Sequence, residues 1–280
     1  MTDQTPSADL PIDEQVRHEV TAGVAWITLD RPDVKNAISP AQRNRVIELL
    51  GDASEQLGIR VVVIGATGNA FCTGADLRAR QPAPPKPEGA PERPVGHVSR
   101  IIRTGAQRLI SAVLDCEKPV IAVVNGTAAG IGAHLALAAD LVIAADTARF
   151  IEVFSRRALV PDGGGAYLLP RLVGMHTAKE LMFFGDDVSA ADAQRLGLIN
   201  KVVPAAELAR ATGEWAARLA TGPTHALGLT KWLVNRSLDS DRATAFTEEA
   251  WAQEMNMATT DAAEGVQSFL QRREPEYRGW

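Results

Sequence analysis

The chain has 280 residues, of which 46% are hydrophobic and 22% charged, enough for one large globular domain with a sizeable core. Its formal net charge is −5, so no overall positive field favours nucleic acid or an anionic membrane surface. No apolar run approaches the roughly 20 residues that a membrane-spanning helix needs. These properties predict a protein that binds neither nucleic acid nor a membrane.

The cysteines and the N-terminal segment indicate the cellular compartment and the domain layout. Cys72 and Cys116 are too few for a disulfide framework, which favours the reducing cytoplasm. Residues 1–15 are polar and acidic, without the positive start and apolar stretch of a signal peptide. We expect a disordered leader over 1–15, a core over 16–204 and a helical C-terminal region over 205–280.

The first predicted elements are a hairpin, a helix and a buried strand. Residues 16–29 alternate in polarity and predict a β-hairpin. Helical spacing over 40–57 follows Ser39, a suitable N-cap, and Pro40, a suitable first helical residue. The apolar run at 60–65 is typical of a strand that is buried on both faces.

A proline-rich segment separates these elements from the rest of the chain. After a loop at 66–78, residues 81–96 hold six prolines, a composition that forms no regular element. This segment is either a surface insertion or a lid beside a site. An amphipathic helix is expected over 98–115.

Short strands and helices alternate from here to about residue 204, and helices alone follow. The expected strands or extended segments are 120–124, 141–145, 150–154 and 199–203. The expected helices are 132–139, 163–173 (interrupted at Pro170), 177–184, 190–196, 205–220, 224–238, 242–258 and 260–273. This order predicts an α/β body followed by a helical tail.

The loop Phe71-Cys72-Thr73-Gly74-Ala75-Asp76-Leu77 follows the buried strand, at the edge of a sheet where ligands usually bind. Gly74 allows the backbone to turn, so that the N–H of Ala75 can point into a cleft. The plainer alternative is a connection that Asp76 caps.

The glycine-rich turn at 126–132 leads directly into a helix, which places the N–H of Ile131 at the helix start. A dinucleotide-binding loop does not fit, because Leu135 occupies the position of the third glycine of that motif. A phosphate-binding P-loop is also absent from the sequence. The turn therefore offers a backbone anion site other than a nucleotide site.

A second glycine cluster at 161–165 reads Pro-Asp-Gly-Gly-Gly. Its single acid, Asp162, has two interpretations. It is either a general base or the N-cap of the helix expected at 163–173.

Taken together, these segments resemble the crotonase (enoyl-CoA hydratase/isomerase) superfamily over nearly the whole chain. The matching stretches are RPDVKNAI (31–38), FCTGADL (71–77), VNGTAAGIGAHLALAADLVIAADTARF (124–150), VPDGGGAYLLPRLVG (160–174), AKELMFFGDDVSAADAQRLGLINKVVP (178–204) and FLQRREPEYRG (269–279). The resemblance implies a ββα spiral core with a C-terminal helical extension.

The resemblance also implies thioester chemistry on acyl-CoA. The backbone N–H groups of Ala75 and Ile131 would form an oxyanion hole for the thioester carbonyl, with one donor worth roughly 3–4 kcal/mol in the transition state. Coenzyme A is then part of the substrate, and no further cofactor or metal is expected.

Two departures from the family pattern concern the acids. Family hydratases carry two glutamates, and the matching positions here hold His134 and Phe154. Glu152 lies two residues before Phe154 and would share its face on an extended strand. Concerted water addition by a glutamate pair is therefore not expected.

Asp162 becomes the candidate acid/base, because it resembles the acid of family isomerases with a similar turn. A single carboxylate in a partly desolvated place can take a proton from one carbon and return it to another. His134 is either a neutral, hydrogen-bonding participant or a buried histidine with a purely structural role.

Ligand contacts and assembly follow from the resemblance only. The segments that would cradle coenzyme A and the acyl group contribute Lys35, Ala37, Gly74, Asp76, Leu77, Gly130 and Phe154. Lys35 or Arg31 would pair with phosphates. The helical tail would mediate a homotrimer or a dimer of trimers.

Three functions remain open from the sequence. The first is an enoyl-CoA isomerase in which Asp162 is the acid/base. The second is an enoyl-CoA hydratase in which His134, Asp162 or Glu152 positions water. The third is an acyl-CoA-binding protein without catalysis. The missing glutamates disfavour the second, and the acid of the second glycine cluster favours the first over the third.

Overall fold

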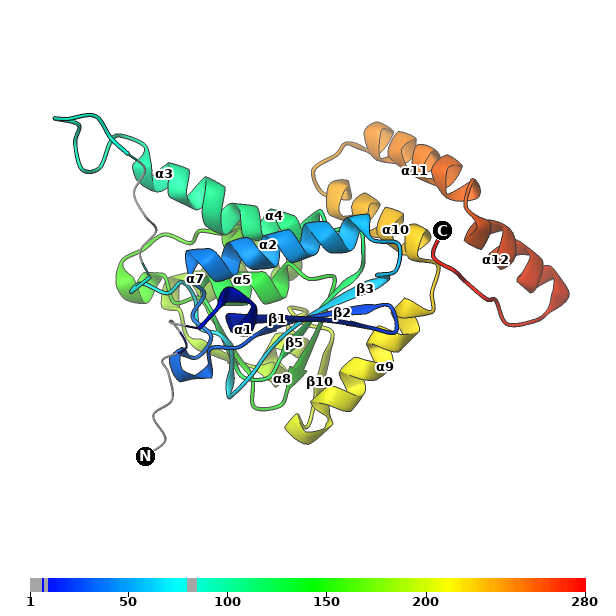
Figure 1. Cartoon of the computed structure of the whole chain (residues 1–280), viewed down its shortest axis with the longest axis horizontal. Helices are drawn as coiled ribbons and strands as arrows, with labels where there is room; N and C mark the ends of the chain where they lie inside the picture. The colour runs from blue at the N-terminus through cyan, green and yellow to red at the C-terminus, as the bar shows by residue number, and fades with distance from the viewer. Residues whose placement is uncertain (1–6, 8–9, 80–84) are drawn as a thin grey trace.

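A six-stranded sheet forms the centre of the fold (Figure 1). The computed structural model describes residue 7, residues 10–79 and residues 85–280. The strands, in spatial order, are β1 (Val16–Thr21), β2 (Val24–Leu29), β3 (Val61–Ala66), β5 (Val120–Val124), β7 (Leu141–Ala145) and β10 (Lys201–Val203). Only β1 and β2 pair antiparallel, which confirms the expected hairpin.

A second, smaller sheet runs beside the first and was not expected from the sequence. Its strands are β4 (Ala70–Cys72), β6 (Thr127–Ala129), β8 (Arg149–Ile151) and β9 (Asp187–Ser189). Each of β3, β5 and β7 is followed along the chain by one strand of this small sheet. The chain thus alternates between two sheets as it advances, which is the expected spiral of β-strands and helices.

Helices cover both faces of the large sheet. On one face lies α2 (Pro40–Glu55), which begins with a capping box between Ser39 and Gln42, as the sequence led us to expect for its N-cap. On the other face lies α9 (Leu208–Ala220), whose apolar side packs on β3 and β7. The boundary expected at residue 204 therefore does not separate α9 from the core.

The expected helix at 98–115 is continuous but not uniform. It consists of α3 (His97–Ile102), a π-helical segment η3 (Arg103–Gln107) and α4 (Arg108–Leu114). Residues 85–96 contain no helix or strand. Residues 80–84 lie outside the described residues, so the choice between insertion and lid stays open.

Two local expectations are wrong. The segment expected to be extended over 150–154 leaves the strand after Ile151, and Phe154 has helical dihedrals and starts the 3₁₀ turn η4 (Ser155–Arg157). The helix expected to break at Pro170 continues through it as α6 (Gly165–Val173). Pro170 removes one backbone donor, while its own carbonyl still accepts from Gly174 N.

The expectation of a disordered leader fails for the end of that segment. Residues Ile12–Gln15 form the short helix α1, and Gln15 is buried. Ser7 is also buried and accepts a hydrogen bond from Arg31 Nε at 3.2 Å.

The remaining helices follow the expected order. They are η2 (Pro32–Val34), α5 (Ile131–Leu137), α7 (Met175–Phe184), α8 (Ala190–Arg195), η5 (Ala205–Glu207), α10 (Thr224–Ser237), α11 (Arg242–Met257) and α12 (Thr260–Gln271). Figure 1 shows α11 and α12 extending away from the sheet. In the described part of the chain, no helix combines the length and apolar character that crossing a bilayer requires.

Candidate active site

Three loops of the candidate site leave the same edge of the small sheet. β4, β6 and β8 are neighbouring parallel strands, so their carboxyl ends lie side by side. The loop holding Gly74 and Ala75 follows β4, the turn to Ile131 follows β6, and Glu152 follows β8. This topology collects residues that are up to about eighty positions apart in sequence, which is the usual arrangement of ligand sites in α/β proteins.

The first two loops touch each other through their backbones. A Cβ built on Gly132 would lie only 2.1 Å from the carbonyl oxygen of Cys72. A Cβ on Gly74 would lie 3.2 Å from the carbonyl oxygen of Ala129. Glycine is therefore required at position 132 for the start of α5 to approach the first loop this closely.

The backbone N–H of Ala75 is directed away from the loop that supports it. Ala75 forms an isolated parallel bridge with Ile38. Gly74 O accepts from Ile38 N at 2.8 Å, and Asp76 N donates to Ile38 O at 3.0 Å. In a parallel bridge, the two flanking peptide groups make the bonds and the N–H of the central residue faces the opposite side. Ala75 itself is exposed.

The N–H of Ile131 is the first of a helix. Gly130 takes φ 54° and ψ −127°, a conformation that favours glycine, and α5 begins at the next residue. The first N–H groups of a helix have no carbonyl partner within that helix. The described structure thus places two available N–H groups, on Ala75 and Ile131, on two backbone segments in contact.

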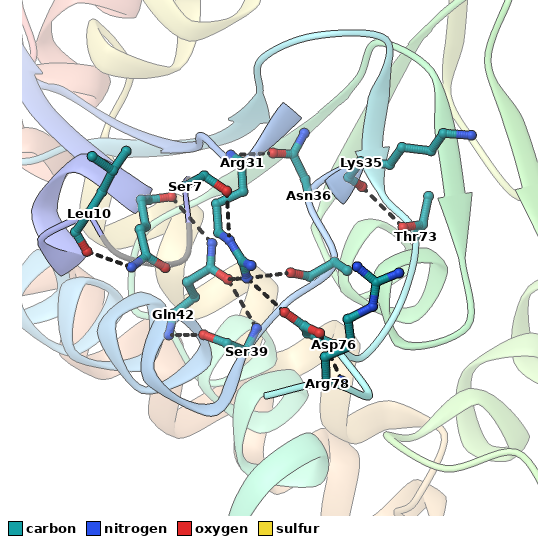
Figure 2. A network of polar contacts seen from close by, with 12 residues as sticks. Ser7, Leu10, Arg31, Lys35, Asn36, Ser39, Gln42, Thr73, Asp76 and Arg78 are labelled. Carbon is teal, nitrogen blue, oxygen red and sulfur yellow. Dashed lines mark hydrogen bonds and ion pairs between the residues drawn. The ribbon is translucent and has the colours of Figure 1, made fainter. Parts of the chain in front are cut away.

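The carboxylate of Asp76 is bound within the protein. Its carboxylate forms an ion pair with Arg31 at 3.0 Å, and only 4% and 10% of the two side chains are exposed (Figure 2). Burial alone would raise the pKa of Asp76, but the backbone N–H of Arg78 and the Arg31 guanidinium bind the carboxylate, and its pKa is lowered. The side chain of Asp76 thus ties two loops together, and the contact expected between the 75–77 segment and coenzyme A stays a prediction.

Arg31 is equally unavailable to a phosphate. Its guanidinium also donates to Gln42 Oε1 at 3.1 Å and to Ala37 O at 3.3 Å (Figure 2). Lys35, in contrast, has an exposed side chain that points away from this network in Figure 2. Of the two cations considered for phosphate, Lys35 is the one that solvent can reach, and Leu77 is also exposed.

His134 lies at the centre of the site and is fully buried. Its Nε2 contacts both carboxylate oxygens of Glu152, at 3.1 and 3.0 Å. The Phe154 ring stacks on the imidazole with a centroid distance of 5.4 Å and an interplanar angle of 13°. Glu152 and Phe154 thus both contact His134, although the strand that was expected to align them ends at Ile151.

The second glycine cluster packs against this histidine. A Cβ on Gly165 would lie 2.2 Å from His134 Nε2, and a Cβ on Gly163 would lie 3.4 Å from Ile131 Cγ1. The turn that carries Asp162 is therefore adjacent to the start of α5. The alternative that Asp162 caps a helix is wrong, since the N-cap of α6 is Gly164 and no side chain caps it.

The carboxyl group of Asp162 is half-buried, and burial raises its pKa. The nearby His134 acts in the opposite direction and lowers it, but burial is the larger effect. A partly desolvated carboxyl group whose pKa is raised is a better proton acceptor than an ordinary aspartate.

Other reactive groups are not arranged for chemistry. Burial raises the pKa of the Cys72 thiol to about 11, so it is protonated at neutral pH. Within residues 7, 10–79 and 85–280, no group of three or more His, Cys, Asp or Glu side chains has the arrangement of a metal site.

The structure brings together most of the residues singled out from the sequence. They are Gly74, Ala75, Gly130, Ile131, His134, Phe154 and Asp162. The side chains of Asp76 and Arg31 form a nearly buried ion pair with each other. The hydrogen bonds between Glu152 and His134 had only a weak signal in the sequence, which was the position of Glu152 two residues before Phe154.

Comparison with known proteins agrees with this arrangement. The family model described as enoyl-CoA hydratase/isomerase matches residues 19–279. A relative from Rhodobacter capsulatus named "Probable enoyl-CoA hydratase" is 38% identical, covering 94% of this chain and 98% of its own. A 1,2-epoxyphenylacetyl-CoA isomerase from Escherichia coli is 36% identical, covering 95% of this chain and 99% of its own.

Solved structures give the same result. The crystal structure of an enoyl-CoA hydratase from Bacillus anthracis is 34% identical and superposes with a TM-score of 0.84, over 95% of this chain and all of its own. Because the family model spans most of the sequence and relatives above 30% identity match almost end to end, the chain belongs to the enoyl-CoA hydratase/isomerase family of the crotonase superfamily.

Proposed function

We propose that this protein is an enoyl-CoA isomerase that shifts a double bond with Asp162 as its single acid/base. The thioester carbonyl would accept hydrogen bonds from the N–H groups of Ala75 and Ile131. These donors would stabilise the negative charge that develops on the oxygen when a proton leaves the carbon chain. Asp162 would take that proton from one carbon and return it to another, so no proton is gained or lost overall.

One observation carries the preference for isomerisation. Of the two carboxylates beside the start of α5, Glu152 is buried and has both oxygens on His134, whereas Asp162 is half-exposed and its pKa is raised. Addition of water by a pair of acids needs two available groups. A proton shuttle needs one, which matches Asp162.

The names of the relatives include both isomerases and hydratases, so they support the family activity without separating the two reactions. The E. coli relative is named an isomerase and the R. capsulatus relative a hydratase. We therefore base the choice on the site. Binding without catalysis is disfavoured, because an acid with a raised pKa adjoins the candidate donors.

The test compares two reactions on defined probes. Isomerisation of trans-3-hexenoyl-CoA creates a conjugated thioester, and hydration of trans-2-hexenoyl-CoA removes one, so both are followed by ultraviolet absorbance. The wild-type protein should isomerise the first probe. Asp162→Asn should lower kcat by about 10²–10⁴-fold, the usual contribution of a general base, while acyl-CoA affinity by calorimetry stays unchanged.

The matched control is Asp52→Asn, which alters an exposed aspartate on α2 and should keep full activity. A wild-type protein that hydrates trans-2-hexenoyl-CoA without isomerising the other probe would establish the hydratase alternative. Binding without either reaction would establish the non-catalytic alternative. Normal turnover by Asp162→Asn would exclude the role given to Asp162.

A further inference from the structure

The imidazole of His134 is bound at one edge only. Glu152 occupies Nε2 with both oxygens. Nδ1 is buried and has no hydrogen-bond partner among the described residues. A buried polar atom without a partner costs about 1–3 kcal/mol, so such an atom indicates a partner that arrives with ligand or with a small movement.

The free edge faces the turn of the candidate base. A Cβ built on Gly163 would lie 3.6 Å from His134 Nδ1, and Gly163 directly follows Asp162. His134 is also the charged group that acts on the Asp162 carboxyl. Catalytic hydrogen bonds are often long without substrate and shorten when it binds.

The two similar distances from His134 Nε2 to the Glu152 oxygens indicate that Nε2 is the hydrogen-bond donor. Two carboxylate oxygens at nearly equal distance from Nε2 are typical of an N–H that points between them. A carboxylate buried this deeply needs a compensating cation, and His134 is the only ion-pair partner of Glu152 within the described residues. In place of the neutral histidine expected from the sequence, this arrangement calls for an imidazole with a proton on each nitrogen, so that Nδ1–H is a second donor.

We propose that Glu152 and His134 form a positioning pair for Asp162, in which Glu152 holds the imidazole through Nε2 and Nδ1–H binds the Asp162 carboxylate when acyl-CoA occupies the site. His134 is a positioning residue here and does not touch the reacting carbons. The inference rests on the proposed acid/base role of Asp162. Packing keeps the ring close to this turn, since a Cβ on Gly165 would lie 2.2 Å from Nε2.

Few other charges reach this histidine. The titratable side chains on the elements packed against α5, namely β4, β5, β6, α4 and α6, are Cys72, Arg108, Tyr167 and Arg171. The thiol is protonated at neutral pH. Arg108 is exposed, and Tyr167 and Arg171 bind Asp239 at the surface. The pair and Asp162 are therefore the charged groups that matter at this position.

The test is the pH dependence of kcat/KM for trans-3-hexenoyl-CoA. His134→Gln removes the donor and the positive charge beside Asp162, so the acidic limb should move to higher pH by about one unit or more. Glu152→Gln should move the limb in the same direction, because the imidazole loses the carboxylate that holds its Nε2 and keeps Nδ1 directed toward the Asp162 turn. KM should stay unchanged in both variants, since neither side chain contacts substrate.

The matched control is His18→Gln, an exposed histidine on β1, which should leave the profile unchanged. Circular dichroism shows whether each variant is folded, and Glu152→Gln keeps the test valid if His134→Gln does not fold. A folded variant of either residue with the wild-type acidic limb would overturn the inference. If Asp162→Asn is inactive while the acidic limbs of His134→Gln and Glu152→Gln match the wild type, only the positioning pair is wrong. If Asp162→Asn is active, the proposed function itself fails.

Discussion

Gly132 offers the sharpest test of how the two donor loops are held together. In Gly132→Ala, the new Cβ would sit 2.1 Å from the carbonyl oxygen of Cys72. Real Cβ atoms essentially never approach closer than 3.0 Å, so α5 and the first loop must separate by about 0.9 Å. The neighbouring atoms are backbone and a buried Cβ, which have little freedom to adjust.

That separation moves the N–H of Ile131 relative to the N–H of Ala75. A misplacement of about 1 Å can cost on the order of 10²-fold in rate. Complete loss of one oxyanion donor costs about 10²–10³-fold, which sets the upper limit. We expect Gly132→Ala to lower kcat for isomerisation of trans-3-hexenoyl-CoA by about 10²-fold, and also to destabilise the fold by roughly 1–3 kcal/mol through overpacking.

Gly51→Ala is the matched control, because Gly51 also lies inside a helix, but an added Cβ there would meet no atom within 4 Å beyond its chain neighbours and the nearby backbone of its own helix. It should leave kcat unchanged and raise the free energy of unfolding by up to about 1 kcal/mol, the difference in helix propensity. Urea denaturation and steady-state kinetics measure both quantities. A folded Gly132→Ala protein with wild-type kcat would refute the reasoning that this contact aligns the donors.

Two further predictions concern stability. Burial raises the pKa of Asp162 in the folded state above its unfolded value, so folding favours the protonated carboxyl. The contribution of Asp162 to the free energy of unfolding is therefore lost as the pH rises through the folded pKa. Asp162→Asn should therefore have a higher free energy of unfolding than the wild type at pH 7. This advantage should vanish below about pH 4, the unfolded pKa of aspartate. Urea titrations that show the variant and the wild type equally stable at both pH values would contradict the assigned burial. Arg31→Gln leaves Asp76 buried without its cation and should cost about 3–5 kcal/mol of unfolding free energy. Arg210→Gln breaks only exposed ion pairs and should change the free energy of unfolding far less. Equal losses in these two variants would show that the Arg31–Asp76 pair is not a structural tie.

Much of the fold was predictable because its signals are local. The run Val61–Ile64 has the apolar character of a doubly buried strand, and it forms β3 with all four residues buried. Ser39 and Pro40 fix the start of α2 through contacts within one helical turn. The helices of the C-terminal tail were predictable for the same reason, since apolar spacing repeats within each.

The short strands of the second sheet were not predictable in this way. β4, β6 and β8 contain only three residues each, too few for a pattern of alternation. Their pairing comes from segments about twenty to sixty residues apart. The helical turn at Phe154 overrode the expected strand, because its backbone conformation depends on packing against α5 and the neighbouring loops.

For the candidate site, the sequence by itself predicted the two glycine turns and, through the family resemblance, singled out the N–H groups of Ala75 and Ile131 as candidate donors and Asp162 as the candidate acid. Only the tertiary structure decided which polar residues are free to act. It paired Arg31 with Asp76 across 45 positions and His134 with Glu152 across 18. The physical reason is that burying a charge requires a partner, and packing between distant segments decides which partner is within reach.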